Sequence, residues 1–300
     1  MRVVVDSNAL REQELQHWLT ASKSHYAVLT DYLWMEIYKG NERLALIESL
    51  ATLRNFPDQV LLLKGTKEIS AIGGAGPGYA NAMIQSISRA KFPETVKGLV
   101  GVERAELSAM LAITEHGRVA KAHFKKTAGV RDDFVEFLSV ADALFGKGAS
   151  AEIRGRKGLN RDFLDRFFFA VDSMYERLLK QHPSKPRSVR GKNRANHFMW
   201  RYALAANLLT KKYIKNGSNV PAEKRLVNDM ADIMFAVYAT YFNGVMTSDV
   251  GLRSLYLELD VILRRLGAKV PTHYIEHPDT RALFSYGDSN EAKAVEVTQP

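Results

Sequence analysis

Short apolar segments that lead into segments with helical spacing are the feature that most restricts the fold of this chain of 300 residues. Residues 2–5, 26–29 and 60–63 are apolar runs of the kind found in buried strands, and residues 245–246 form a shorter one. The first, second and fourth runs end at Asp, Ser, Thr or Asn residues that cap helices, and helical spacing follows. Strands that alternate with helices predict an α/β fold with a parallel central sheet.

The chain between the third and fourth runs is predicted to be mainly helical. Residues 79–215 have helical spacing, with expected breaks near residues 97–98, 128–129, 146–148, 155–158 and 182–186. The glycine-rich loop at residues 73–78 lacks the Lys-Ser/Thr pair of a P-loop, so we interpret it as a hinge. Residues 270–275 are a candidate for an additional strand, and residues 291–300 have the composition of a disordered tail.

Five carboxylates occupy defined places in this pattern. Asp6 and Asp249 each stand after a strand and before a helix, and Glu36 lies on the helix that follows the second strand. Asp229 and Asp232 are three residues apart on the helix before the last strand, so they share one face. Because the carboxyl ends of parallel strands meet at one edge, the five acids can converge there. Taken singly, each acid has an ordinary alternative role as a helix cap or a solvated helix residue.

Carboxylates crowded into one pocket cannot all stay ionised without a cation. Hard divalent ions such as Mg²⁺ and Mn²⁺ prefer oxygen ligands of this kind. The chain has no cysteine, which excludes thiolate catalysis and Cys-ligated zinc. The acids therefore predict a site for Mg²⁺ or Mn²⁺.

The positive charge of the chain is concentrated in one segment. The formal net charge is +9, and residues 177–222 contain eleven Lys or Arg residues and no acid. The remainder carries 31 basic and 33 acidic residues, which is a net charge of −2. This asymmetry favours a nucleic acid bound by one surface over a charged linker that only aids solubility.

Residues 190–215 combine basic and apolar side chains in a segment with helical spacing. Trp200 could stack on an unpaired base, but we interpret it as a core residue. Arg190 and His197 also fit the short Arg–spacer–His pattern of metal-free ribonucleases, an interpretation that ranks below the acidic site. We expect the phosphate backbone to be bound by Arg187, Arg190, Lys192, Arg194, His197, Arg201, Lys211 and Lys212.

The sequence also gives an expectation for the cellular location. No apolar run approaches the roughly 18–20 residues needed to span a bilayer. The apolar run at the N-terminus is too short for a signal peptide. We therefore expect a cytoplasmic protein without membrane contacts.

Three motifs together resemble the PIN-domain ribonucleases. They are MRVVVDSNAL at residues 1–10, LTDYLWMEIYKG at residues 29–40, and NDMADIMFAVYATYFNGVMTSDVGL at residues 228–252. In that family an acid ends the first strand, a Glu lies on an early helix, and one or two acids lie on a late helix. A further Asp follows a strand in a Thr/Ser-x-Asp setting, which is Thr247-Ser248-Asp249 in this chain.

The resemblance implies a three-layer α/β/α sandwich with an acidic cleft, formed by residues 1–65 and 221–275. Residues 66–220 would be a large all-helical insertion that includes the basic segment, and residues 276–300 a C-terminal extension with a disordered end. The implied activity is metal-dependent endonucleolytic cleavage, mostly of RNA, with one or two Mg²⁺ or Mn²⁺ ions. The implied metal ligands are Asp6, Glu36, Asp229 or Asp232, and Asp249, oriented by Asn8, Thr247 and Ser248.

Several alternatives remain open from the sequence. The chain could be a nucleic-acid-binding module with a degenerate, metal-free site, or a structure-specific DNA nuclease, because the same metals act on both nucleic acids. The expected partner is RNA, either single-stranded or structured as in tRNA, with a second copy of the chain or a regulatory protein as further candidates. Toxin, defence and RNA-processing roles all fit a ribonuclease of this kind.

Overall fold

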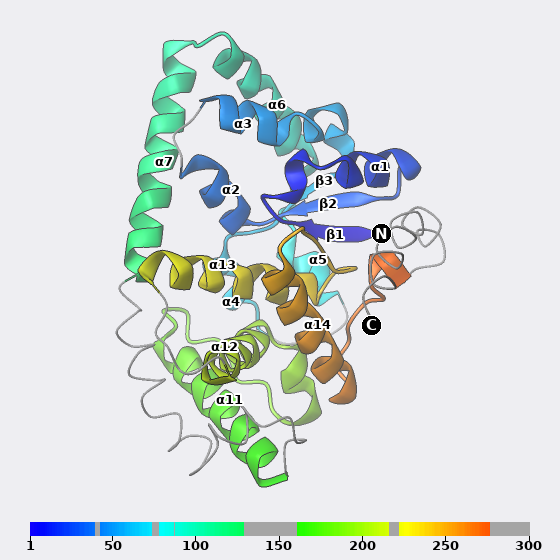
Figure 1. The fold of residues 1–300 in the computed structure, drawn as a ribbon, viewed down its shortest axis with the longest axis vertical. Helices are drawn as coiled ribbons and strands as arrows, with labels where there is room; N and C mark the ends of the chain where they lie inside the picture. The colour runs from blue at the N-terminus through cyan, green and yellow to red at the C-terminus, as the bar shows by residue number, and fades with distance from the viewer. Residues whose placement is uncertain (40–42, 74–77, 87, 129–160, 216–221, 277–300) are drawn as a thin grey trace, which may run out of the picture.

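A computed structural model of the protein describes residues 1–39, 43–73, 78–86, 88–128, 161–215 and 222–276. The described strands are β1 (Arg2–Val5), β2 (Tyr26–Leu29), β3 (Val60–Leu62) and β4 (Val245–Met246), and they form one parallel sheet in the order β3-β2-β1-β4 (Figure 1). Val4 of β1 is in register with Val28 of β2 and with Val245 of β4. The prediction of an α/β fold with a parallel sheet is therefore confirmed.

Helices make up most of the described chain. The first α-helices are α1 (Gln13–Ala21), α2 (Asp31–Tyr38), α3 (Arg43–Leu50), α4 (Thr66–Ser70), α5 (Tyr79–Met83), α6 (Ser88–Glu103) and α7 (Leu107–Ala128). The later ones are α11 (Arg161–Gln181), α12 (Phe198–Lys215), α13 (Glu223–Ala239) and α14 (Val250–Arg265). Short 3₁₀ helices span Ala9–Arg11, Leu53–Asn55, Pro57–Gln59, Gly191–Asn196 and Tyr274–Glu276.

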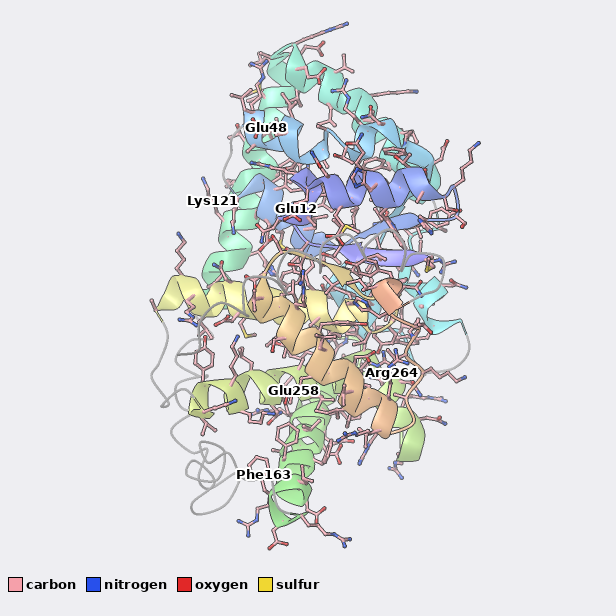
Figure 2. The ribbon with its side chains drawn as sticks, turned by 45° about the vertical axis from the view of Figure 1, so that its right-hand side comes forward. Glu12, Glu48, Lys121, Phe163, Glu258 and Arg264 are labelled. Carbon is pink, nitrogen blue, oxygen red and sulfur yellow. The ribbon has the colours of Figure 1, made fainter. Side chains whose placement is uncertain are left out.

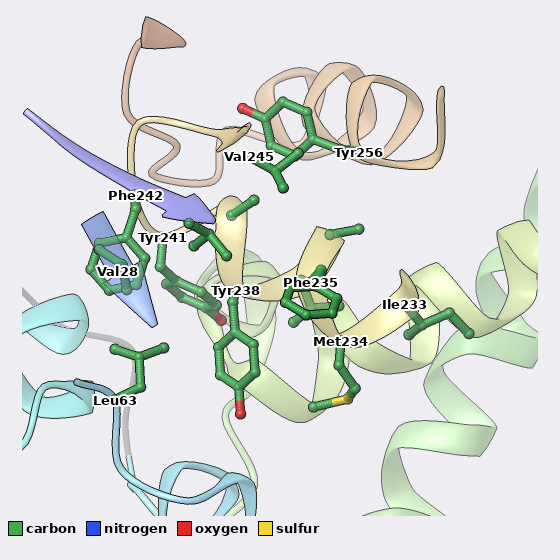
Figure 3. Close-up of a cluster of buried hydrophobic side chains, with 14 of the residues drawn as sticks. Val28, Leu63, Ile233, Met234, Phe235, Tyr238, Tyr241, Phe242, Val245 and Tyr256 are labelled. Atoms are coloured by element: carbon green, nitrogen blue, oxygen red, sulfur yellow. The ribbon is translucent and has the colours of Figure 1, made fainter. Parts of the chain in front are cut away.

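Helices lie on both sides of the sheet, with α3 and α6 on one side and α13 and α12 on the other (Figure 1). A single hydrophobic core includes Val4 of the sheet, Phe235 of α13, Leu204 of α12 and Phe167 of α11. Figure 3 shows part of it, with Val28, Tyr238 and Phe242 among the labelled side chains. The helices α11 and α12, expected within an insertion, thus share the core of the α/β part. In the described residues, no helix is both long and apolar enough to cross a membrane.

The turn between α13 and β4 lies against the first strand, so it connects late residues of the chain with the N-terminal ones by hydrogen bonds. Gly244 has a φ of +108°, a conformation that L side chains rarely adopt, and Val4 N donates to its carbonyl oxygen at 3.0 Å. The side-chain oxygen of Asn243 accepts a hydrogen bond from Arg2 N at 2.9 Å. This turn therefore fixes the register of β4 against β1.

Two expectations for local structure were wrong, and others lie outside the described residues. Residues 270–273 are irregular and a 3₁₀ helix follows, so the predicted strand at residues 270–275 does not form. α6 continues through Gly98, where a break was expected, because its packing against β3 stabilises the helix. The break at residues 182–186 is confirmed by the end of α11. Residues 74–77 of the glycine-rich loop, the breaks at 146–148 and 155–158, and the predicted tail lie outside the described residues.

Candidate active site

Asp6 stands at the carboxyl end of β1, where neighbouring groups hold its carboxylate in one orientation. Thr247, which follows β4, donates its hydroxyl to Asp6 Oδ2 at 2.8 Å. Asn8 Nδ2 donates to the same oxygen at 3.2 Å, and the backbone N–H of Ser7 donates to Oδ1 at 2.7 Å. Asn8 and Thr247 thus both contact the Asp6 carboxylate directly, as their predicted orienting role requires. The pKa of Asp6 is raised, mainly by burial; hydrogen bonds from Thr247 and Ser7 offset part of this rise, and repulsion from Asp249 adds to it.

Asp249 is joined to Asp6 through the hydroxyl of Thr247. The backbone N–H of Asp249 donates to Thr247 Oγ1 at 3.0 Å, while that hydroxyl donates to Asp6. The carboxylate of Asp249 is the N-cap of α14 and accepts from Leu252 N at 2.8 Å. Ser248, the other predicted orienting residue, is exposed. The adjacency of β1 and β4 therefore brings together two acids that are 243 positions apart in the chain.

Glu36 approaches Asp6 from α2. The N-cap of α2 is Thr30, whose hydroxyl oxygen accepts from Leu33 N at 3.1 Å, and this cap starts the helix directly after β2. Burial raises the pKa of Glu36, a hydrogen bond from Ser7 lowers it, and the charge of Asp6 raises it. In the described part of the chain, Glu36 Oε2 is buried and has no hydrogen-bond partner. A buried carboxylate oxygen without a partner is unfavourable unless a cation or water completes the site.

Asp229 and Asp232 of α13 lie in different surroundings. The carboxylate of Asp229 accepts a hydrogen bond from the hydroxyl of Tyr213 on α12. Burial is the main cause that raises the pKa of Asp232, and repulsion from all four other acids of the predicted set raises it further, to about 8. Asp232 is therefore the better candidate for a shared metal site, whereas Asp229 is held by a neighbouring helix.

The five carboxylates influence one another electrostatically, but they do not lie close enough together to form the coordination shell of a metal ion. Among the described residues, no three Asp, Glu or His side chains lie close enough to bind one metal ion. The local hydrogen bonds explain this spacing, because Thr247, Tyr213 and Leu252 N each hold one carboxylate. Repulsion between carboxylates favours such separation when no cation is present. The donor atoms of these side chains are all oxygens, and Glu36 Oε2 has no hydrogen-bond partner among the described residues, so the site fits Mg²⁺ or Mn²⁺. Binding of the ion would require the carboxylates to move closer together.

Two residues of the predicted nucleic-acid surface are buried, so the prediction was wrong for them. Arg201 is 0% exposed and donates to the carbonyl oxygens of Ala195, Thr240 and Lys269. His197 is also 0% exposed, and burial lowers its pKa to about 4, so it is neutral at physiological pH. A buried, neutral imidazole is also a poor acid–base group for the alternative Arg190/His197 mechanism. Trp200 is buried as expected.

The remaining basic residues fall into two groups. Arg187 and Arg190 are exposed after α11, whereas Arg194 forms an ion pair with Asp172 at 2.6 Å. Lys211 forms an ion pair with Glu258 of α14, the residue labelled in Figure 2. The side chain of Lys192 is outside the described part.

Lys212 lies closer to the acids than the sequence indicated. The position that a Cβ would take on Gly251 is 3.0 Å from Asp249 Oδ1 and 3.5 Å from Lys212 Nζ. The carboxylate and the ammonium group therefore flank the same point at the start of α14. This places one cation of the basic segment beside the acidic site.

Sequence reasoning missed several residues that shape this site. Ser7 interacts with both Asp6 and Glu36, and its place between Asp6 and Asn8 was the available signal. Arg253, one turn after Asp249, donates to the carbonyl oxygen of Thr247 at 2.7 Å. Tyr213 had no sequence signal, because its contact with Asp229 depends on how two helices pack.

Asp31 is a further buried carboxylate at the same sheet edge, where it follows β2. It accepts hydrogen bonds from Thr66 N at 2.7 Å and from Thr66 Oγ1 at 2.9 Å. Burial raises its pKa, and the hydrogen bonds from Thr66 lower it. Asp31 thus has its own partners on α4 and contributes to the packing of this edge.

Comparisons of the chain with protein-family models, with curated proteins and with solved structures found no match.

Proposed function

We propose that this protein is a Mg²⁺- or Mn²⁺-dependent endoribonuclease with a PIN-like α/β/α core, acting in the cytoplasm. The observation that carries the proposal is the link between Asp6 and Asp249 through the hydroxyl of Thr247. This link supports a shared site at the carboxyl edge of the sheet, where open parallel sheets bind ligands. The pKa of Asp232, which burial and then repulsion from the other four acids raise to about 8, supports the same site from a third element.

The proposed metal ligands are Asp6, Glu36, Asp232 and Asp249. A bound divalent ion would lower the pKa of a water molecule and neutralise charge on the scissile phosphate. The hydroxyl of Thr247 fixes the orientation of the Asp6 carboxylate before substrate arrives.

Cations near the acids support an anionic substrate. Lys212 lies next to Asp249 and is placed to offset the repulsion between a phosphate and the carboxylates. Arg187 and Arg190, in another part of the protein chain, are exposed and supply positive charge that binds the RNA backbone. The biological setting, whether toxin, defence or RNA processing, stays a prediction.

The test is cleavage of labelled RNA with and without Mn²⁺ or Mg²⁺, with the cut sites mapped. Asp6→Asn should reduce cleavage by at least about 100-fold, because it removes one anionic ligand while keeping the shape of the side chain. RNA affinity should change little. Asp31→Asn is the matched control, since it makes the same change to a buried carboxylate at the same sheet edge, and it should keep cleavage as long as it stays folded. Metal-independent cleavage, or full activity of Asp6→Asn, would refute the acidic-site mechanism.

A DNA nuclease is the second candidate, and it shares the same acids. Single-stranded RNA and DNA oligonucleotides of identical sequence distinguish the two. We expect the RNA to be cleaved faster; equal or faster cleavage of the DNA would replace the proposal of a ribonuclease by one of a DNA nuclease.

A further inference from the structure

A cleft of about 460 Å³ lies beside the proposed active site, on the other side of α2. Trp34 and Tyr38 of α2 line it, whereas Glu36, between them in sequence, interacts with Asp6. Residues two apart on a helix point in different directions, so α2 separates the two sites. The volume falls in the range of sites for small ligands. The other lining residues are Met35, Leu62, Gln85, Glu94, Thr95, His116, Val119 and Ala120.

Three rings in this cleft form a column in which the first pair is stacked and the second pair is tilted. The ring centroids of Trp34 and Tyr38 are 6.1 Å apart with 24° between the planes. Those of Tyr38 and His116, from α7, are 4.9 Å apart with 32° between the planes. All three side chains are partly or fully exposed, so a planar ligand can extend the column. Stacking on aromatic rings is the usual way in which proteins hold unpaired bases.

Both hydrogen-bond donors and acceptors line the cleft. Gln85 Nε2 donates to the carbonyl oxygen of Leu63 at 3.0 Å, which fixes the amide orientation. Its oxygen, Oε1, is buried and has no hydrogen-bond partner within the described part of the chain. Glu94 adds an exposed carboxylate. The two carboxylate oxygens of Glu94, next to a stacking surface, match a base with several donors on one edge, and guanine presents adjacent N1–H and N2–H₂ groups.

We infer that this cleft binds a guanine base of the RNA substrate, with the exposed carboxylate of Glu94 accepting hydrogen bonds from its donor edge. The inference rests on the proposed function for the identity of the substrate. An α-helix is about 10 Å across with its side chains, so the bound guanine would belong to a nucleotide close to the cleaved phosphate. Uracil presents two carbonyl oxygens beside its single N–H, and these would face the acceptors unfavourably.

Trp34 makes the inference directly measurable. The chain has three tryptophans, and Trp18 and Trp200 are 0% and 1% exposed, so a ligand in the cleft acts on the fluorescence of Trp34. Titration of the full chain with GMP, AMP, CMP and UMP, without divalent metal, should give saturable quenching. GMP should bind at least about tenfold more tightly than UMP, as expected for hydrogen bonds to a charged acceptor. No saturable quenching, or equal affinity for the four nucleotides, would overturn the guanine assignment.

A pair of variants tests the role of the carboxylate. Glu94→Gln keeps the shape of the side chain but replaces one acceptor oxygen by a donor, and it should reduce the preference for GMP to less than about threefold. The matched control is Asp165→Asn on the exposed face of α11, which removes the same charge far from the cleft and should leave the preference unchanged. Unchanged GMP preference in Glu94→Gln would refute the reading of guanine by this residue.

A failure of the guanine inference can be distinguished from a failure of the proposed nuclease function. Nucleotide binding is measured without cleavage, so Asp6→Asn should bind GMP like the unchanged protein. Quenching by GMP in a protein that cleaves no RNA would leave the cleft as a guanine site and refute the nuclease. Metal-dependent cleavage without any preference for cuts near guanine would support the nuclease and refute the guanine site.

Discussion

Asp232→Asn should make the metal-free protein more stable while abolishing its activity. The carboxyl group of Asp232 has a pKa of about 8 in the fold, against 3.8 for an ordinary Asp, because it is partly buried and repelled by four other acids. At pH 7 such a difference corresponds to about 4 kcal/mol of unfolding free energy. Asparagine removes the ionisable proton and the repulsion, but it keeps the size of the side chain.

The measured gain should be smaller than this value, at about 1–3 kcal/mol near pH 8, because solvent screening and small shifts of the acids relieve part of the repulsion. Its pH dependence has a defined sign. The stability associated with protonated Asp232 is fully present below about pH 3.8 and is lost as the pH rises towards about 8. The difference between variant and unchanged protein should therefore grow between pH 5 and pH 8 and level off above that.

Urea denaturation at several pH values, without metal and with excess EDTA, measures this difference. The matched control is Asp229→Asn, which lies three residues away on the same helix but loses the hydrogen bond from Tyr213. It removes only one of the four charges that repel Asp232, so its gain should be smaller than that of Asp232→Asn at every pH. Addition of Mn²⁺ should stabilise the unchanged protein more than Asp232→Asn, because the ion binds the acid that the variant lacks. Equal stability of the two proteins at pH 8 would refute the crowding of charges at Asp232.

Three further outcomes follow from contacts described above. Thr247→Val removes the hydroxyl that donates to Asp6, so the pKa of Asp6 should rise further and the pH–rate profile of RNA cleavage should shift to higher pH; an unmoved profile would contradict an orienting role. Gly244→Ala should destabilise the protein by more than about 2 kcal/mol in urea, because its φ is +108° and the added Cβ would meet the ring of His273 at 2.5 Å; a loss below about 0.5 kcal/mol would contradict it. Arg190→Ala should lower RNA affinity and reduce the slope of log affinity against log salt by about 0.7, whereas an unchanged slope would exclude a phosphate contact.

The sheet and its acidic edge could be predicted because they depend on local signals and on one topological rule. The short apolar runs define strands, and right-handed crossovers then place the residues after parallel strands at one edge. This rule alone predicts that Asp6 and Asp249 lie near each other, and Thr247 links them in the fold. It could not separate Asp229 from Asp232, because the difference is a hydrogen bond from Tyr213 on another helix.

The basic segment shows where the sequence pattern fails. Arg201 looks like any other cation of this segment, but five hydrogen bonds and a contact with the ring of Tyr241 at 4.0 Å place it in the core. Charge patterns along a chain do not show which cations are satisfied inside the protein. The failed strand at residues 270–275 has a similar cause: this segment passes the turn at Asn243, to which Tyr274 N donates at 2.8 Å, instead of pairing along β4.

The bond between Thr247 and Asp6 has a consequence for the time at which activity arises during translation. The two residues are 241 positions apart, so a ribosome must make most of the chain before the bond can form. Domains fold as they are synthesised, and the first three strands can assemble early. A nascent or prematurely terminated chain that lacks Thr247 and Asp249 would hold only part of the acidic set. The proposed nuclease would thus be inactive while the chain is still attached to the ribosome, whose RNA it could damage.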